Sequence, residues 1–432
     1  MNKKISVNLA VAIALIAMTV TFSITMIMSM KIFDKTVSSV REKEIMYNKI
    51  AEIDKRVRAD YFGEIQDSAL LDMMSAGYMA GIGDGKNAKY YTTAQYQELL
   101  DIQNGKVVGV GIDVAKLASG YARVLRVYAD SPAAAAAIEK DFTITKIGDI
   151  DVKTLTIDQV QALLRGEQGT DVTITYINMM AEEQPPVVLR RTPYETKSVE
   201  YQMPEGKKTG YVKILTFNNK TAAEVDAAVR DLQDKGANAL VFDVRNNAGG
   251  LLQGAVDTID VLCPSGAIGS TEDKDGIVRS LGLSDASEVK IPMVVLTNKD
   301  TASAAELFAT SIRDFGKGKL VGVKTYGKGT IQCAPVRLAD SSAISFTTGK
   351  LLTSKGETFD GTGLIPDEEI ALKPEEEQNF LDFTMESDPQ ILRAIEVAQS
   401  LRTKEDVAKG IAPNSDAVSS SKVTSASQGA EK

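Results

Sequence analysis

Two short stretches of the chain carry the residues best suited to hydrolytic chemistry. Residues 301–306 (TASAAE) place Ser303 among small residues at the start of an expected helix. Residues 326–332 (YGKGTIQ) place Lys328 between two glycines, just before an expected strand. A serine hydroxyl attacks a carbonyl only if a base removes its proton as the new bond forms. We therefore take Ser303 as a candidate nucleophile and Lys328 as its candidate base.

The composition excludes histidine as the base. The chain of 432 residues contains no histidine, so a Ser-His-Asp triad, a Cys-His pair and a His-ligated metal site are all impossible. Its two cysteines, Cys263 and Cys333, either pair or are two small apolar residues, and we favour the second interpretation. We expect no metal and no cofactor. A net charge of -9 argues against nucleic acid as a partner.

A lysine serves as a base when burial disfavours its ammonium form and lowers its pKa. Apolar residues flank the Lys328 turn, and Gln332 is expected on the same strand face, where its amide would orient the amine. The glycine turn at Gly249 and the start of the Ser303 helix would supply N–H donors for an oxyanion. The competing interpretation is that Ser303 only caps its helix.

Two other motifs fit their known roles poorly. Residues 322–328 match the start of a phosphate-binding loop, but Gly329 stands where that motif needs serine or threonine and a strand follows instead of a helix. The Ser-x-x-Lys at residues 287–290 and the Lys-Thr-Gly at 208–210 occur in the reverse of the order found in penicillin-recognising enzymes. We set both aside.

The N-terminal part of the chain is expected to be helical. An uncharged run over residues 5–30 is long enough to cross a bilayer, and we interpret it as an uncleaved signal anchor in preference to a cleaved signal peptide. Over residues 35–102 we predict helices, one at 69–82 and one opened by a Thr92 cap. The spacing of four apolar residues predicts a buried stripe: Met46, Ile50, Ile53 and Val57.

The next two blocks differ in period. Residues 107–191 indicate a compact mixed domain of short strands with helices at 131–139 and 156–164. Its loop at Val110, Gly111 and Ile112 can offer backbone N–H groups to a peptide carboxylate. Residues 209–372 alternate strand and helix, which predicts a sheet with helices on its faces and with Gly249 and Ser303 at strand-to-helix turns. Acidic helical sequence follows to about residue 402, then a polar tail.

The sequence resembles the carboxyl-terminal processing peptidases, serine peptidases with a Ser/Lys site and an inserted PDZ domain. The resemblance runs from about residue 74 to 367 and rests on LVFDVRNNAGGLLQGAV, PMVVLTNKDTASAAELFATSIRDF, LVGVKTYGKGTIQ and GTGLIPD. It implies the following roles: Ser303 as nucleophile, Lys328 as general base, Gln332 as the residue that positions the lysine, Gly249 and the Ala304 backbone as oxyanion donors, Glu306 as support, Val110, Gly111 and Ile112 as the PDZ carboxylate loop, and Arg165 as a link between PDZ domain and core. Residues 136–141 (AAIEKD) stand where the family usually has glycines around this turn, which puts the ligand preference of the PDZ domain in question.

We therefore expect an α/β peptidase core with a mixed sheet and packed helices, an inserted PDZ-like α+β domain, a helical N-terminal region and one transmembrane helix. The expected boundaries are 1–34 for the tail and anchor, 35–103 for the helical region, 104–192 for the PDZ domain, 193–372 for the serine peptidase core, 373–402 for a C-terminal helical segment and 403–432 for a disordered tail.

The expected function is that of a single-pass serine endopeptidase in a bacterial-type cell membrane. Its catalytic part would lie outside the cytoplasm and cleave proteins or peptides whose C-termini the PDZ domain captures. The competing hypothesis is an anchored PDZ scaffold without activity. Partners would be substrate C-termini and the membrane, with a homodimer left open. The sequence names neither the substrate nor an activating partner.

Overall fold

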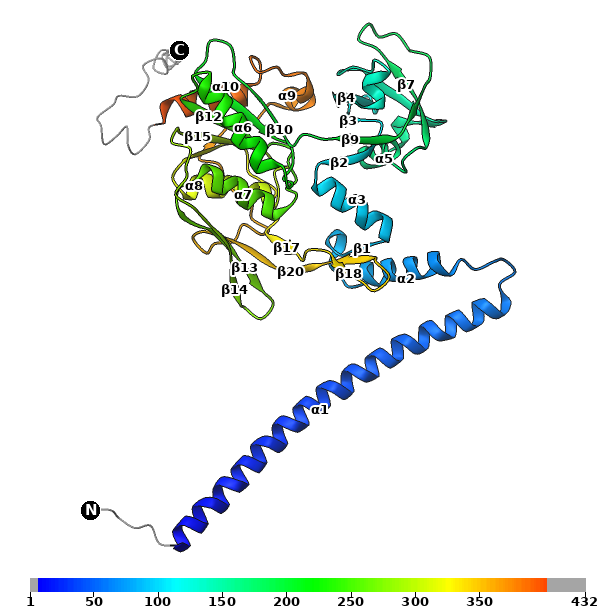
Figure 1. The fold of residues 1–432 in the computed structure, drawn as a ribbon, viewed down its shortest axis with the longest axis vertical. Coiled ribbons are helices and arrows are strands. Elements are labelled where there is room, and N and C mark those ends of the chain that lie inside the picture. Colours follow the sequence, from blue (N-terminus) through cyan, green and yellow to red (C-terminus); the bar gives the residue numbers. More distant parts are fainter. Residues whose placement is uncertain (1–6, 402–432) are drawn as a thin grey trace, which may run out of the picture. The chain divides into compact units, whose positions relative to one another are not determined.

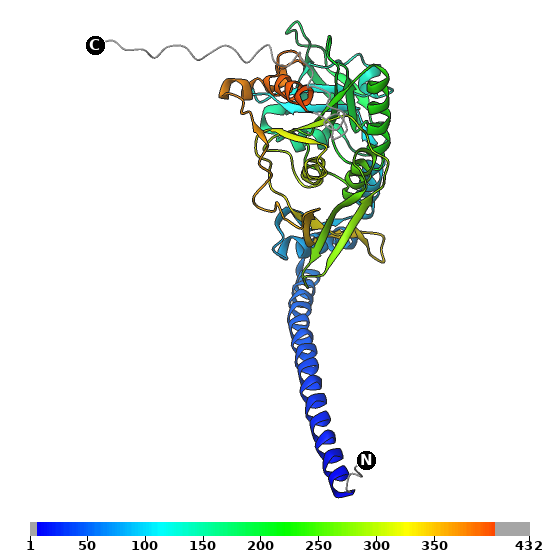
Figure 2. The same cartoon turned by 90° about the vertical axis from the view of Figure 1, so that its left-hand side faces the viewer.

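The computed structural model describes residues 7–401 and divides into two units, residues 1–75 and 76–432, each of which we describe by itself. In the first unit, α1 (Val7–Asp60) runs through residue 34 as one unbroken helix (Figure 2), and α2 (Asp67–Gly81) follows it. Ala12–Met30 within α1 is long and apolar enough to cross a membrane, a property it shares with signal sequences.

The buried stripe expected on the later part of α1 is wrong. Ile50, Ile53 and Val57 are 37, 54 and 43 % exposed. Their helical spacing is that of an apolar face, yet nothing else described in the first unit covers them. The helical period is present, but periodicity alone does not say what buries a face.

A six-stranded sheet forms the centre of the second unit. Five of its strands, β11, β12, β15, β16 and β21, are parallel to one another, and β10 pairs antiparallel with β11 at the edge. In spatial order the strands are β10 (Val199–Gln202), β11 (Thr209–Ile214), β12 (Ala239–Asp243), β15 (Met293–Thr297), β16 (Gly318–Gly322) and β21 (Glu368–Glu369). This arrangement confirms the expected sheet with packed helices.

Helices cover both faces of this sheet (Figure 1). Leu240 and Phe242 of β12 belong to one core with residues of three helices, α6 (Thr221–Asp234), α7 (Leu252–Leu262) and α8 (Ala304–Asp314). Val241 points to the other face and packs with Ile391 and Ile395 of α10 (Pro389–Ser400). Because both faces are covered, the central strands are continuous apolar runs.

Two smaller sheets were not predicted. One has the order β14 (Val278–Ser284), β13 (Gly266–Asp273), β20 (Thr347–Thr353) and β17 (Thr330–Gln332). The other has the order β1 (Lys89–Tyr91), β19 (Ala343–Ser345) and β18 (Val336–Arg337). Through β1, the segment that contains η1 (Gly85–Asn87) and precedes α3 (Thr93–Gln103) joins residues more than 250 positions later. The predicted Thr92 cap of α3 is confirmed, since its side chain accepts the Gln95 N–H.

The block predicted as a mixed domain folds around one antiparallel sheet. Its strands are β3 (Ile112–Lys116), β4 (Ala122–Val127), β5 (Thr143–Ile147), β7 (Asp171–Ile177) and β8 (Val187–Arg190), with β6 (Ile150–Asp151) paired to β5. Its helices are α5 (Ile157–Leu164) and η2 (Val152–Thr154). β2 (Lys106–Gly109) pairs with β9 (Thr192–Glu195), where the chain enters and leaves the domain.

The predicted helix at 131–139 is much shorter than expected. α4 covers only Pro132–Ala135, because Ala137 takes a left-handed φ of 55° that no helix can continue through. Asp141 follows with a φ of 70°. Glycine adopts such angles at no steric cost.

The C-terminal segment contains α9 (Pro374–Gln378), η3 (Phe380–Asp382) and α10. Asp388 caps α10, which confirms helical structure in this acidic stretch. The tail predicted to be disordered, residues 403–432, lies outside the described residues.

Candidate active site

Ser303 occupies a strained turn between β15 and α8. Its φ of 58° and ψ of -120° lie outside the regions that L-residues favour, and it directly precedes the first residue of α8. A sharp strand-to-helix turn of this kind exposes a serine hydroxyl, as at the nucleophile of the α/β-hydrolases. The small neighbours Ala302 and Ala304 are both buried, so only small side chains fit beside it. Strain retained at a half-buried serine is typical of a functional site.

Glu306 connects this turn to the lysine loop. Its carboxylate is fully buried and accepts the Ser303 N–H at 2.9 Å. The same carboxylate accepts the backbone N–H groups of Gly327 at 2.8 Å and Lys328 at 2.9 Å, and the Thr325 hydroxyl at 2.5 Å. One side chain thus fixes the backbones of both candidate catalytic residues.

A second loop holds the lysine turn from the other side. Gly329 donates its N–H to Asp360, and Gly361 donates to the Gly327 carbonyl. Gly327 has a φ of 90°, and a Cβ there would lie 2.6 Å from the Gly363 nitrogen, so only glycine fits. Lys328 is therefore presented from a rigid turn.

The electrostatic setting of Lys328 suits a base. Its side chain is half-buried, and burial together with repulsion from Lys89 lowers the pKa of its amine below 10.5, while attraction to Asp84 partly opposes this. A lowered pKa increases the fraction of neutral amine near neutral pH. No hydrogen bond joins this amine to the Ser303 hydroxyl in the described part of the chain.

Gln332 lies in the same region but differs from its predicted geometry. β17 begins only at Thr330 and has an irregular register between Ile331 and Gln332, so the expected alternation on one strand face does not apply. Its amide donates to the Thr347 hydroxyl at 3.1 Å.

The two predicted oxyanion donors are neighbours. A Cβ on Gly249, which has a φ of 104°, would lie 3.1 Å from the Ala304 nitrogen. As the first residue of α8, Ala304 has no acceptor for its N–H within the helix. The Gly249 N–H, however, donates to the Asn247 side chain at 2.8 Å. The Ala304 N–H is thus available to an oxyanion, whereas the Gly249 N–H is already bonded to Asn247.

A buried ionic network at the end of β12 was not predicted from the sequence. Arg245 is 4 % exposed and pairs with Asp243 at 2.7 Å and Asp388 at 2.9 Å, and Tyr211 donates to Asp243. Burial alone would raise the pKa of Asp243, but Arg245 holds it below the ordinary value of 3.8. The available signal was the pair of opposite charges at the end of an apolar strand, Asp243 and Arg245.

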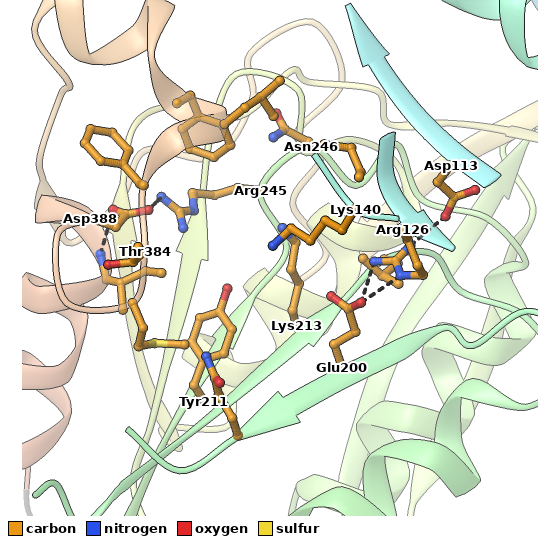
Figure 3. A pocket seen from close by; sticks show the side chains of 18 of the residues that line it. Asp113, Arg126, Lys140, Glu200, Tyr211, Lys213, Arg245, Asn246, Thr384 and Asp388 are labelled. Carbon is orange, nitrogen blue, oxygen red and sulfur yellow. Dashed lines mark hydrogen bonds and ion pairs between the residues drawn. The ribbon is translucent and has the colours of Figure 1, made fainter. Parts of the chain in front are cut away.

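Figure 3 shows Arg245, Asp388 and Tyr211 of this network beside a cavity of about 900 Å³. On the other side of the cavity, Arg126 of β4 pairs with Asp113 at 2.6 Å and Glu200 at 2.7 Å. The pair of Arg126 with Glu200 thus joins the small domain to β10, and the pair of Arg245 with Asp388 joins the central sheet to the C-terminal segment.

The residues predicted to bind a peptide lie in the small domain. Val110, Gly111 and Ile112 are buried between β2 and β3, and the Val110 N–H donates to the Leu164 carbonyl. Arg165 follows α5 and bridges through its backbone to Gly109. The contacts described for Arg165 thus lie at the stem of this domain, the paired strands β2 and β9, and none of them is with Ser303 or Lys328.

Both cysteines are free thiols, so the interpretation without a disulfide is confirmed. Cys263 is fully buried, as expected for a small apolar residue, whereas Cys333 is half-buried. Burial raises the pKa of the Cys263 thiol to about 12, so it is not a competing nucleophile.

Comparison with known proteins identifies the family of this chain. Residues 208–370 match the family described as Peptidase family S41. A carboxyl-terminal-processing protease of Synechocystis sp. is 30 % identical over 310 residues, which cover 70 % of this chain and 71 % of that protein. A probable CtpA-like serine protease of Staphylococcus aureus is 31 % identical over 325 residues, covering 74 % of this chain and 64 % of the relative. The solved photosystem II D1 C-terminal processing protease is 25 % identical with a TM-score of 0.47, covering 74 % of this chain and 86 % of that one. The chain therefore belongs to peptidase family S41, among the carboxyl-terminal-processing serine proteases.

Proposed function

We propose that the protein is a membrane-anchored serine endopeptidase that works through a Ser303–Lys328 dyad. The observation that carries this is the strained Ser303 turn, which Glu306 ties directly to the Lys328 loop. Although no hydrogen bond joins hydroxyl and amine in the described chain, such contacts are often long before substrate binds.

The mechanism follows from these positions. As Ser303 Oγ bonds to the substrate carbonyl carbon, its proton passes to the neutral Lys328 amine. The resulting ammonium gives that proton to the leaving amine nitrogen when the peptide C–N bond breaks. Water then attacks the acyl-enzyme, its proton passes to Lys328 and from there to Ser303 Oγ, and the free acid leaves.

The oxyanion is stabilised by the Ala304 N–H at the start of α8. The Gly249 N–H joins it once Asn247 releases that group. Asn247 thus keeps a buried donor satisfied while no substrate is present. Gln332 would keep its amide N–H on the Thr347 hydroxyl, and its amide oxygen would accept from the lysine.

We assign substrate capture to residues 104–192 as a PDZ domain. A peptide carboxylate would meet the backbone of Val110, Gly111 and Ile112, and the peptide strand would add to β3. Gln161 now donates to the Ile112 carbonyl at 3.1 Å and would have to give way. Arg165, bridged to Gly109, would pass this change to the stem of the domain.

Membrane attachment is assigned to Ala12–Met30 of α1. The length and apolar character of this stretch support it. The short basic N-terminus favours a catalytic part outside the cytoplasm.

Trapping the acyl-enzyme tests this function against an inactive scaffold. The full chain in detergent is mixed with an activated peptide ester, quenched with acid and examined by mass spectrometry. We expect one acyl group on Ser303 and none in Ser303→Ala, while Ser311→Ala, a buried serine of the same helix, still acylates. An unmodified wild type, or acylation at another residue, would support the scaffold.

A further inference from the structure

Asp84 approaches the proposed dyad from a distant part of the chain. It lies in the turn between α2 and η1, between Gly83 and Gly85, whose φ angles of 84° and 58° are both left-handed. Aspartate before a helix usually caps that helix with its side chain. Here the carboxylate makes no such cap, and instead accepts the Thr347 N–H at 2.8 Å, 263 positions away.

Thr347 connects this carboxylate to Gln332. The Gln332 amide donates to the Thr347 hydroxyl at 3.1 Å, and the side chains of Thr347 and Asn87 also hydrogen-bond Asp84. Burial alone would raise the pKa of Asp84, but these hydrogen bonds and attraction to Lys328 lower it, so the group is a carboxylate at neutral pH.

The charges around the Lys328 amine are few. Asp84 attracts it and Lys89 of β1 repels it. Two further carboxylates lie in this loop, Glu306 on the Lys328 backbone N–H and Asp360 on the Gly329 N–H. Asp84 differs from both because Thr347 also connects it to Gln332.

We infer that Asp84 is a positioning residue of the hydrolytic site, which holds Thr347 and Gln332 in place and supplies the counter-charge for the Lys328 ammonium. This inference rests on the proposed Ser303–Lys328 dyad. Lysine takes up the serine proton as the tetrahedral intermediate forms, so a positive charge develops in a half-buried place. A fixed carboxylate nearby stabilises that charge without reorganisation.

The pH dependence of hydrolysis separates this role from a structural one. Neutral Lys328 is the active form, so activity is lost as pH falls through the pKa of its amine. Asp84→Asn keeps an acceptor for the Thr347 N–H but removes the attraction. We expect the acidic limb of kcat/KM to move to lower pH while the alkaline plateau falls about ten-fold, so that the two profiles cross.

Two matched variants complete the experiment, which uses the full chain in detergent and a fluorogenic peptide. Lys89→Gln removes the repulsion, so its acidic limb should move to higher pH. Thr347→Val breaks the contact with Gln332 without changing any charge, so its rate should fall with the limb in place. Asp84→Ser is a second variant without the charge, to be used if Asp84→Asn does not fold.

The outcomes are distinct. A limb that stays in place in Asp84→Asn or Asp84→Ser, whatever the rate, overturns the counter-charge role. If Lys328→Ala is inactive in that experiment, the dyad stands and only the inference about Asp84 fails. If Lys328→Ala cleaves at the wild-type rate, the dyad fails and this inference with it.

Discussion

At the scale of single residues, Glu306 supports both loops of the proposed site, a role that the sequence around it does not show. It accepts from Ser303, Thr325, Gly327 and Lys328 and makes no contact with solvent. Ser303 needs such support because its left-handed backbone costs about 1–3 kcal/mol.

Replacing this carboxylate tests that role. Glu306→Gln puts an NH₂ group where the carboxylate faced N–H donors, so two of them lose their acceptor. We expect a loss of about 2–4 kcal/mol in the free energy of unfolding and a large fall in kcat. Glu376→Gln is the matched control, since that glutamate also accepts an N–H at a helix start but lies near the surface. Urea unfolding that is equal for both variants would contradict the role of Glu306.

At the scale of elements, the central sheet and its turns could be predicted because their signals are local. β12 and β15 are apolar runs, and Ser303 directly precedes a helix. The second sheet was not predicted because β13, β14 and β20 mix glycine, serine and threonine with few apolar residues, and β13 pairs with irregular register. The contact of Asp84 with Thr347 depends on folding of the whole unit, so no short window shows it.

α10 is joined to the central sheet by charge as well as by apolar packing. Asp388 caps the helix with Oδ1 and pairs with Arg245 through Oδ2. Asp388→Asn keeps the cap but places NH₂ against the guanidinium, and breaking a buried pair from one side costs about 3–5 kcal/mol. Denaturant unfolding should show this loss. Asp382→Asn is the control, since its partner Arg123 is reached at the surface and the cost should stay below about 1 kcal/mol.

The same network sets an acid limit. Because the folded-state pKa of Asp243 lies below its ordinary value of 3.8, its contribution is fully present above pH 3.8 and is lost as pH falls through the lower folded value. Circular dichroism should therefore show acid unfolding below this pH.

For the Asp388→Asn prediction, equal stability of the variant and the wild type at pH 7 would show that Arg245 does not need this partner.

At the scale of the whole molecule, each part of the proposed peptidase contributes one feature. α1 supplies an apolar stretch, the small domain the loop that we propose binds a peptide, and the central sheet the Ser303 and Gly249 turns. Residues 84–91 and 343–347, which are more than 250 positions apart in the sequence, meet through β1, β19 and the contact of Asp84 with Thr347, and Asp84 and Lys89 both act on the Lys328 amine. All of these assignments depend on Lys328 acting as the base.

The most direct test is casein cleavage by the full chain in detergent, comparing Lys328→Ala with Lys324→Ala. Lys324 lies four positions earlier and is exposed, so its loss should leave the rate unchanged. We predict that Lys328→Ala loses about 10²–10⁴-fold in kcat while retaining its fold by circular dichroism. Cleavage by Lys328→Ala at the wild-type rate would contradict the proposed mechanism.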